Sequence, residues 1–276
     1  MALKQRLQNL AMSTVDGFMA RVPRKVPGAT ALCECKIISH RGEHDNRTVM
    51  ENTLTAFDNT RAAGVWGLEC DIRWTRDMVP VICHDPDLRR VFGDPAAIAG
   101  LTLAELRERA PAVPTLRDVL LRYGGSQHLM LEVKACDPAQ LPQQRAVLGD
   151  LLARLQPAVD FHILALDTAL FTLVDFLPPA CLLPVAEMNV ARLSREALQR
   201  GYAGIVGHYL LLNRRLQCRH RAAGQRIGTG FPRSERALLR EIGRGVDWVF
   251  SNDAAYLQRK LDALRSQAVS VPGPMH

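Results

Sequence analysis

The sequence lacks the features that would assign a chain to a membrane, to an extracellular compartment or to nucleic acid. None of its apolar runs reaches the length of about 18 residues that a transmembrane helix needs. The first 25 residues lack the compact apolar segment and cleavage site of a secretory signal. Aromatic residues make up only 5% of the 276 residues, and they do not interleave with basic residues as in proteins that stack on bases. These absences predict a cytoplasmic protein that does not bind nucleic acid.

Cysteines and basic residues are present, but neither forms a recognisable binding pattern. The seven cysteines are odd in number and show no zinc-site spacing, so we interpret them as structural thiols. Residues 1–36 hold six basic residues against two acidic ones and so carry more than half of the formal charge of +7. The remaining residues are nearly balanced. The charge therefore gives no support to a nucleic-acid partner.

The N-terminal segment predicts an amphipathic helix. Residues 3–22 carry apolar side chains close to helical spacing, with basic residues on the other faces. Pro23 and Pro27 end this pattern. Two interpretations stay open: the helix packs across the domain or on a second subunit of a homodimer, or it rests on an anionic membrane surface as a peripheral contact. We treat residues 1–35 as a separate segment and residues 266–276 as a flexible tail.

From residue 36 onward, strand patterns and helix patterns alternate. The strand patterns lie at Lys36–Ser39, Leu68–Arg73, Leu129–Val133, Phe161–Leu166, Leu182–Ala186, Gly204–Val206, Arg226–Gly228 and Trp248–Phe250. The helix patterns lie at Thr53–Ala63, Thr115–Arg122, Pro138–Leu155, Thr168–Phe176, Ser194–Arg200, Leu211–Ala223 and Ser234–Arg244. Eight strands with helical crossovers predict an α/β fold, a (β/α)8 TIM barrel, over residues 36–265. An open doubly wound sheet is the alternative, but no Gly-x-Gly-x-x-Gly loop follows any strand.

A β-hairpin interrupts this alternation after the second strand. The segment after Arg73 is too short for a helix, so the chain must return as a hairpin arm over Val79–Cys83. With a two-residue loop, His84 would lie opposite Asp71 or Glu69 and would share their face of the sheet. A three-residue loop would turn His84 to the other face.

Titratable residues gather where the first three barrel strands end. Glu69 and Asp71 are two positions apart and therefore share one face of their strand, and Glu132 and Lys134 repeat that spacing. His40 ends the first strand. Because the C-terminal ends of barrel strands converge on one mouth, we expect these side chains to meet there. Three clustered carboxylates repel one another unless a cation lies among them, and oxygen ligands suit Mg²⁺ or Ca²⁺ rather than zinc.

Eight short motifs occur in the order in which a known family carries them. They are His40-Arg41-Gly42, Glu51-Asn52-Thr53, Glu69-Cys70-Asp71, Thr75-Arg76-Asp77, His84-Asp85-Pro86, Val113–Leu116, Leu131–Lys134 and Gly245–Asp253. With these motifs, over residues 36–258, the chain resembles the glycerophosphodiester phosphodiesterases of the phosphatidylinositol phospholipase C-like superfamily. The resemblance implies a TIM barrel with one divalent metal ion held by Glu69, Asp71 and Glu132.

The resemblance also implies roles for the other residues at the mouth. His40 would act as general base and His84 as general acid across the phosphorus. Arg41 and Lys134 would bind the non-bridging phosphate oxygens and stabilise the charge of the transition state.

Further residues near these motifs receive weaker predictions. Glu51 and Asp85 are expected to orient the two histidines, while Asn52 and Thr53 start the following helix. The loop 43–50 contributes His44 and Asp45, which we expect to be solvated, and Glu187 and His208 are further candidates for lining the mouth.

The expected activity is metal-dependent hydrolysis of glycerophosphodiesters to glycerol 3-phosphate and an alcohol. The attacking oxygen is either the neighbouring glycerol hydroxyl or water. Gly228–Pro232 stands where the family often has a Trp-Thr pair, so a lysophospholipase D or sphingomyelinase D-like activity on lipids is an alternative. A catalytically inactive, membrane-associated scaffold is the alternative from another class, although it would have no need of the clustered acids and histidines.

Overall fold

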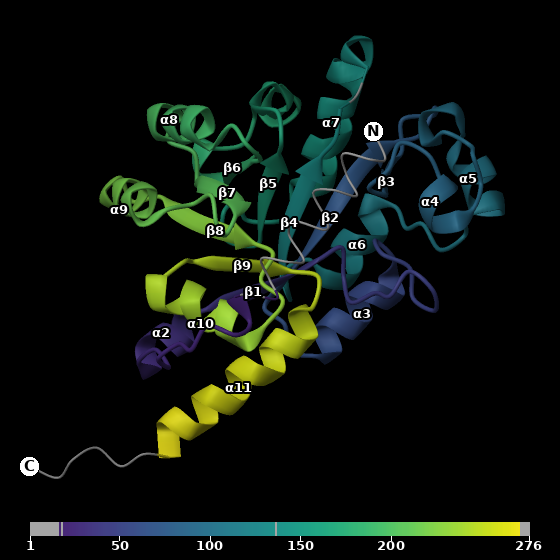
Figure 1. Ribbon diagram of the computed structural model, residues 1–276. Helices are drawn as coiled ribbons and strands as arrows, with labels where there is room; N and C mark the ends of the chain where they lie inside the picture. The colour runs from purple at the N-terminus through teal and green to yellow at the C-terminus, as the bar shows by residue number, and fades with distance from the viewer. Residues whose placement is uncertain (1–16, 18, 136, 271–276) are drawn as a thin grey trace, which may run out of the picture.

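The computed structural model describes residues 17, 19–135 and 137–270. Most of the N-terminal helix expected over residues 3–22 lies outside these residues, and so does the end of the expected tail. The described residues form an eight-stranded parallel barrel surrounded by helices (Figure 1). A ninth strand, β3, pairs antiparallel with β2 beside the barrel. The predicted TIM barrel with a hairpin after its second strand is confirmed.

All eight predicted barrel strands are present, with ends that differ by one or two residues. The strands are β1 Lys36–His40, β2 Gly67–Trp74, β3 Pro80–Ile82, β4 His128–Val133, β5 Phe161–Ala165, β6 Leu182–Ala186, β7 Gly204–His208, β8 Arg226–Gly230 and β9 Trp248–Ser251. Their order around the barrel is the order of the chain, and β1 closes the barrel by pairing with both β9 and β2. Each pairing between barrel strands is parallel, as helical crossovers require.

The helices follow most of the predicted patterns. They are α2 Ala29–Glu34, α3 Leu54–Ala62, α4 Arg89–Phe92, α5 Leu103–Arg109, α6 Leu116–Tyr123, α7 Leu141–Leu152, α8 Val190–Arg200, α9 Arg214–Ala222, α10 Glu235–Arg244 and α11 Ala254–Ser270. Side-chain caps begin several of them: Thr53 accepts from the backbone N–H of Ala56 and Asn213 from that of Leu216. The predicted helix over Thr168–Phe176 is instead a 3₁₀ helix, Thr168–Val174.

The ends of the domain differ from the prediction. The tail predicted from residue 266 is wrong over residues 266–270, because α11 continues to Ser270. At the other end, the segment predicted as a linker before residue 36 contains α2, whose Leu32 is buried. Arg265 on α11 donates hydrogen bonds to the backbone carbonyls of Leu32, Cys33 and Cys35. These contacts make α2 and α11 parts of the barrel domain.

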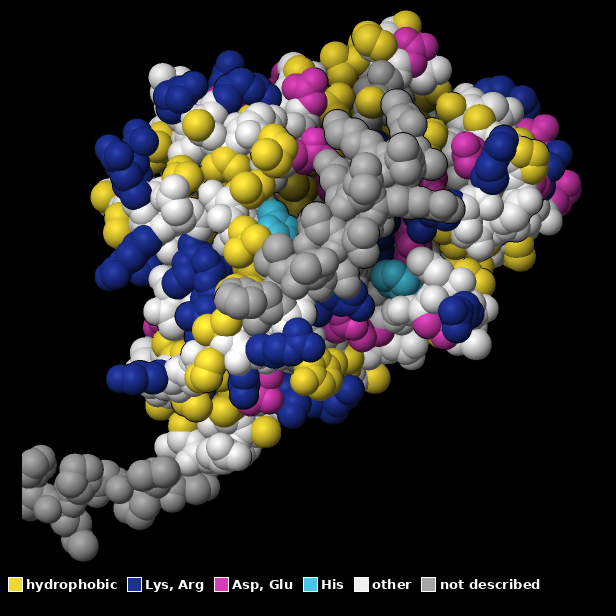
Figure 2. Space-filling view, viewed as in Figure 1, with side chains coloured by type: hydrophobic (Ala, Val, Ile, Leu, Met, Phe, Trp, Pro, Cys, Tyr) yellow, Lys and Arg dark blue, Asp and Glu magenta, His cyan; other side chains and the backbone are white. Residues whose placement is uncertain are grey.

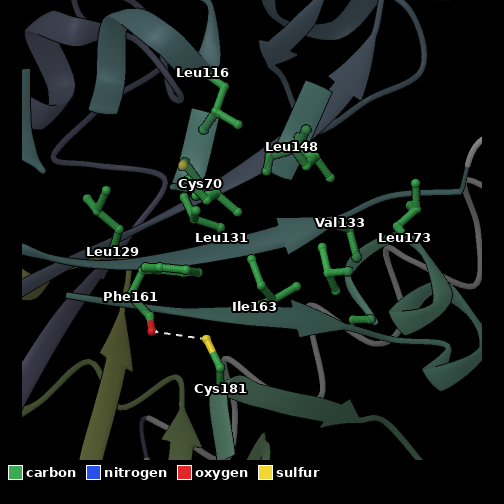
Figure 3. Close-up of a cluster of buried hydrophobic side chains, with 14 of the residues drawn as sticks. Cys70, Leu116, Leu129, Leu131, Val133, Leu148, Phe161, Ile163, Leu173 and Cys181 are labelled. Carbon is green, nitrogen blue, oxygen red and sulfur yellow. Dashed lines mark hydrogen bonds between the residues drawn. The ribbon is translucent and has the colours of Figure 1, made fainter. Parts of the chain in front are cut away.

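Two apolar layers hold the barrel together, one inside it and one between its strands and helices. Along β4, Leu129, Leu131 and Val133 face the helices, and Met130 faces the barrel axis. Figure 3 shows the outer layer, in which strand side chains such as Leu131 and Ile163 pack against α6 and α7. The alternation follows from the period of two in a strand. On the inward face, the same period places Glu132 two residues beyond Met130, near the mouth.

The hairpin turns through a three-residue loop, which decides between the two loop lengths that the sequence left open. Thr75 and Val79 close the loop through a hydrogen bond of 3.1 Å from the Thr75 N–H to the Val79 carbonyl. Met78 supplies the left-handed backbone conformation, φ 60°, that such a loop uses. In this register Ile72 pairs with Ile82, and a continued ladder would turn His84 away from the acidic face. The strand ends at Ile82, however, and the chain leaves the ladder before His84.

A small helical excursion follows the hairpin before the chain returns to the barrel. It contains α4 and α5 and has its own apolar core, formed by Val81, Cys83, Leu88, Ile98, Leu106, Ala110 and Val113. Thr102 begins α5 with a capping box, in which its side chain and that of Glu105 bond each other's backbone N–H. The excursion brings Arg90, on α4, back to the mouth of the barrel.

Aromatic and histidine rings close the end of the barrel opposite the mouth. Trp66 stacks on His128 at 4.4 Å between ring centroids, and the Nε2 atom of His128 lies 2.8 Å from Nδ1 of His162. The ring of Trp248 meets His162 edge-on at 4.9 Å. His128 and His162 are 6% and 2% exposed, and burial lowers the pKa of His128 to about 4 and that of His162 to about 3. Both rings are therefore neutral at pH 7.

This histidine pair predicts a loss of stability in mild acid. An unfolded histidine titrates near pH 6.5, so below that pH the unfolded chain binds protons that the folded chain does not bind. This pair should therefore contribute about 2–4 kcal/mol to the fall in the free energy of unfolding between pH 7 and pH 5. Urea unfolding at both pH values measures the fall, and His162→Gln should reduce it by about 1–2 kcal/mol. Equal falls in the wild type and the variant would contradict this assignment.

Within the described part of the chain, no helix is both long and apolar enough to span a bilayer. The six described cysteines form no disulfide bond. Four of them, Cys35, Cys70, Cys83 and Cys181, are buried, and burial raises the pKa of each thiol. Buried thiols of this kind pack as small apolar side chains, in agreement with the structural role expected for them.

Candidate active site at the mouth of the barrel

Five of the predicted residues meet at the C-terminal ends of three neighbouring barrel strands. His40 ends β1 and pairs in register with Glu69 on β2, and Asp71 pairs in register with Glu132 on β4. Lys134 follows β4 directly. Because side chains opposite each other in register point to the same face, the strand order alone brings these groups together at the mouth.

The three predicted metal ligands form one buried cluster. Glu69, Asp71 and Glu132 each place one carboxylate oxygen within 4.8 Å of the others, and they are 1%, 0% and 8% exposed. Burial, together with the neighbouring negative charges, raises the pKa values of Glu69 and Glu132 above their usual range. Burial also opposes ionisation of Asp71, but its contacts with Lys134 and Arg41 hold the pKa of this carboxyl below its usual value.

Two cations and one amide complete this cluster. The Lys134 ammonium lies 2.7 Å from Oδ1 of Asp71 and also contacts Glu132. The Arg41 Nε atom lies 3.3 Å from Oδ2 of Asp71, and the side chain of Asn52 donates a hydrogen bond of 2.8 Å to the same oxygen. Three carboxylates therefore face two cations, which leaves one negative charge in excess.

The cluster fits a divalent metal ion. Its donors are all carboxylate oxygens, which hard cations prefer. The Oε1 atom of Glu69 is buried without a hydrogen-bond partner, and so is the Oδ1 atom of Asn52. A buried carboxylate oxygen with no donor is costly unless a cation or proton satisfies it. Glu69, Asp71 and Glu132 could therefore hold a metal, as predicted.

His40 lies beside this cluster in a fixed orientation. Its Nε2 atom is 3.8 Å from Oε2 of Glu69, and its Nδ1 atom is 2.6 Å from Oδ1 of Asn252, which follows β9. The ring also packs on Phe231 at 4.7 Å between centroids. Burial and the charge of Arg41 lower the pKa of His40 to about 3. Because Nδ1 donates to the Asn252 carbonyl, Nε2 is the nitrogen that can accept a proton on the side of the cluster.

His84 comes close to the same groups although it does not pair with the acidic strand. Burial lowers the pKa of His84. The charges of Arg41 and Lys134 lower it further, while the charge of Asp71 opposes the shift. Its Nδ1 atom lies 2.8 Å from Oδ1 of Asp85. One third of the His84 side chain is exposed. Asp85 therefore contacts the His84 ring directly, and its orienting role stays a prediction.

Glu51 holds two arginines, and among the described residues no hydrogen bond joins its side chain to His40 or His84, the two histidines that it was expected to orient. Its carboxylate accepts hydrogen bonds of 3.0 Å from Arg41 and of 2.6 and 2.8 Å from Arg90. Arg90 also donates to Asp85 at 2.6 Å. Although burial opposes ionisation of Glu51, these arginines keep its pKa below the usual value. Glu51 therefore positions Arg41 and links it to the side of the site that carries His84.

The remaining candidates from the sequence lie around the edge of the site. Asp45 accepts hydrogen bonds from the backbone N–H groups of residues 47–49, so it shapes the loop as a turn residue does. The His44 Nε2 atom lies 3.9 Å from Glu51. Glu187 is exposed after β6, and His208 ends β7, on the side of the barrel opposite β2.

Sequence reasoning missed the roles of Asn252, Asn52 and Arg90. The two asparagines stand in the quoted motifs, where their position at a strand end or in the loop before α3 was the available signal. Asn52 has a left-handed backbone, φ 58°, and Arg41 has φ 62°, conformations that are costly for residues other than glycine and that concentrate at functional sites.

Gly42, φ 79°, follows Arg41, and a Cβ there would lie 2.7 Å from that of Ala56. This turn therefore requires glycine at position 42.

Part of this sequence, and the fold, have counterparts among known proteins. A family model described as the glycerophosphoryl diester phosphodiesterase family matches residues 40–168, a segment that begins with His40 and contains every residue of the acidic cluster. Over this segment the chain is similar to the glycerophosphodiester phosphodiesterase family. Members of that family therefore provide the comparison for the fold.

The curated relatives match over short segments. A probable glycerophosphodiester phosphodiesterase 1 of Mycobacterium tuberculosis is 40% identical over 72 residues, which is 26% of each chain. A glycerophosphodiester phosphodiesterase of Caldanaerobacter subterraneus is 29% identical over 111 residues, 36% of this chain and 45% of the relative. The matches thus span less than half the length of these relatives.

Solved structures of the family share the fold over most of the chain. The glycerophosphodiester phosphodiesterase of Thermotoga maritima has a TM-score of 0.69 at 21% identity and covers 81% of this chain and 96% of its own. A phosphodiesterase of Oleispira antarctica, solved with the product sn-glycerol-3-phosphate, has a TM-score of 0.68 at 23% identity, covering 82% and 96%. At these identities the likeness concerns the barrel fold.

Proposed function

We propose that this chain hydrolyses glycerophosphodiesters to glycerol 3-phosphate and an alcohol. The observation that carries the proposal is the meeting, at one mouth, of a buried carboxylate cluster, two cations and two histidines. A phosphodiester is a poor electrophile because its negative charge repels nucleophiles. Positive charge near the phosphate oxygens reduces this repulsion. A proton acceptor and a proton donor on opposite sides of the phosphorus assist the attack and the departure of the alcohol.

Each group has a part in this reaction. A divalent ion, when bound by the carboxylate cluster, would polarise the phosphate and stabilise its growing charge. Arg41 and Lys134 bind the non-bridging oxygens of the phosphate. His40 accepts the proton of the attacking oxygen at Nε2, and His84, in its doubly protonated imidazolium form, donates its Nε2 proton to the departing alkoxide. The neutral state of His40 at pH 7 suits a proton acceptor, and the contact with Asp85 holds His84 in place as donor.

We propose Mg²⁺ or Ca²⁺ as the ion. Oxygen-only ligation favours a hard cation over zinc. Glu69, Asp71 and Glu132 supply three protein ligands, fewer than the six to eight oxygens that Ca²⁺ takes, so substrate and water oxygens would complete either coordination shell.

A substrate panel tests the proposed function. Purified protein is incubated with glycerophosphocholine, glycerophosphoethanolamine or lysophosphatidylcholine, in chelator, Mg²⁺ or Ca²⁺, and glycerol 3-phosphate is measured with a coupled assay. We expect the product from the deacylated diesters, only with a metal, and about 10³-fold less from the Glu132→Gln variant, which also controls for contaminating activity. Turnover in chelator, or turnover of lysophosphatidylcholine alone, would contradict the proposal.

A further inference from the structure

Exposed apolar side chains stand on three consecutive loops at the mouth of the barrel. Leu166, Met188 and Leu210 follow β5, β6 and β7 and are 42%, 85% and 42% exposed. These strands pair in sequence, β5 with β6 and β6 with β7, so their C-terminal ends lie side by side. The three side chains therefore form a row along one side of the mouth, which begins next to β4 and continues away from the acidic cluster.

Arginines are concentrated on α8 and α9, the two helices that follow the loops of Met188 and Leu210. Residues 187–222 contain seven arginines against two glutamates. Arg192 and Arg200 pair with Glu196. Four further exposed arginines on α8 and α9 form no ion pair with the described residues. They are Arg195, Arg214, Arg215 and Arg219. The segment thus holds an excess of positive charge on one flank of an otherwise mixed surface.

The arginines also line a groove between two helices. The groove, of about 290 Å³, is bounded by Arg195 on α8 and by Arg215 and Arg219 on α9, with Ser194 and Asn213 among its polar walls. Figure 2 shows dark blue and yellow side chains next to one another over α8 and α9, on the left of the view. Three guanidinium groups around a hollow of this size suit the phosphate of a lipid head group.

We propose that this side of the mouth, the row Leu166, Met188 and Leu210 together with the arginines of α8 and α9, docks on an anionic phospholipid surface. Single apolar side chains that enter the interface, backed by basic residues that attract the head groups, are the pattern of shallow peripheral binding. The acidic residues on these loops, Asp167 and Glu187, are few against the arginines.

The same features argue against nucleic acid as the occupant. A nucleic-acid surface would gain nothing from exposed methionine and leucine, and it would use aromatic rings for stacking. The two tyrosines of the segment, Tyr202 and Tyr209, are 6% and 0% exposed, so neither ring is available to a base. An anionic lipid surface satisfies the apolar row and the arginines together. Docking in this way would bring the active-site mouth against the membrane, whichever diester the site hydrolyses.

Vesicle sedimentation tests the proposal with the full chain. The probe is large unilamellar vesicles of phosphatidylcholine, alone or with about one third phosphatidylglycerol. Arg215→Glu/Arg219→Glu should lower partitioning to the anionic vesicles about tenfold or more. The matched control, Arg107→Glu/Arg117→Glu, reverses the same charge on exposed arginines of α5 and α6 and should change partitioning less than about twofold.

A second pair of variants tests the apolar row. Met188→Gln/Leu210→Gln should lower partitioning about fivefold, while Leu121→Gln/Val159→Gln, at exposed positions elsewhere, should leave it unchanged. Every variant keeps residues 1–28, so any contribution from that segment is equal in all arms, and turnover of soluble glycerophosphocholine checks that each variant is folded. Equal partitioning of a variant pair and its control, equal binding to neutral vesicles, or displacement of the vesicles by duplex DNA would overturn the proposal.

Discussion

Replacing His40 with alanine is expected to lower kcat/KM on glycerophosphocholine by about 10²–10⁴-fold. The reason is the position of the ring: Nδ1 is held by Asn252 at 2.6 Å, and Nε2 is directed to the side where Glu69 lies 3.8 Å away. Loss of the proton acceptor removes an interaction made in the transition state, so kcat should fall while KM changes little. Steady-state kinetics with saturating metal measures both constants.

His44→Ala provides the matched control for this variant. His44 lies four residues further along the same loop, and its ring bonds the carbonyl of Gly42 at 2.8 Å. Its Nε2 atom approaches Glu51 and not the carboxylate cluster of Glu69, Asp71 and Glu132. We expect this variant to keep at least about a tenth of the wild-type kcat/KM. Turnover by His40→Ala equal to that of the control would refute the proposed base.

Glu69→Gln is expected to lower turnover strongly and to stabilise the metal-free protein at the same time. Three carboxylates face two cations in the cluster, and the Oε1 atom of Glu69 has no donor although the residue is 1% exposed. Removing this charge balances the cluster and should raise the free energy of unfolding in chelator by about 1–3 kcal/mol, or Tm by about 3–8 °C. It should also weaken metal binding enough to lower turnover about 10³-fold.

The same substitution at Glu241 should have the opposite effect on stability. Glu241 is also fully buried, but it is paired with Arg240 and Arg244, so Glu241→Gln leaves two cations without a counter-charge. Its Tm should fall, because breaking a buried ion pair exposes the cost of the remaining charge. Differential scanning calorimetry in chelator compares the two variants. A lower Tm for Glu69→Gln would show that its charge is already compensated without a metal.

The sequence was sufficient for the barrel and for the carboxylate cluster because both follow from periodicity. A period of two places Glu69 with Asp71, and parallel strands place Glu132 beside them at the same end of the barrel. The hairpin register depended on a different property, the left-handed backbone of Met78. Methionine has no particular preference for that conformation, so residue type alone gave no sign of a three-residue loop.

Partners that are far apart in the chain were the least predictable part of the site. The partner of His40 is Asn252, 212 positions away, and that of Glu51 is Arg90, 39 positions away. Both contacts depend on where a helix or strand lies in the folded structure, which no local sequence pattern specifies. The missed helix α11 differs, since Leu257, Leu261 and Leu264 are buried at helical spacing and the pattern was readable.

The ring stack at the closed end of the barrel limits where small molecules can enter and leave. Trp66, His128, His162 and Trp248 pack together at that end, and buried apolar side chains follow them inside the barrel, as in the packed interior of this type of fold. In the proposed reaction, substrate and both products would therefore enter and leave at the mouth. If Arg41 and Lys134 bind the phosphate as proposed, a product that leaves them slowly would block the next substrate, and the rate of product release would then limit the rate of substrate entry.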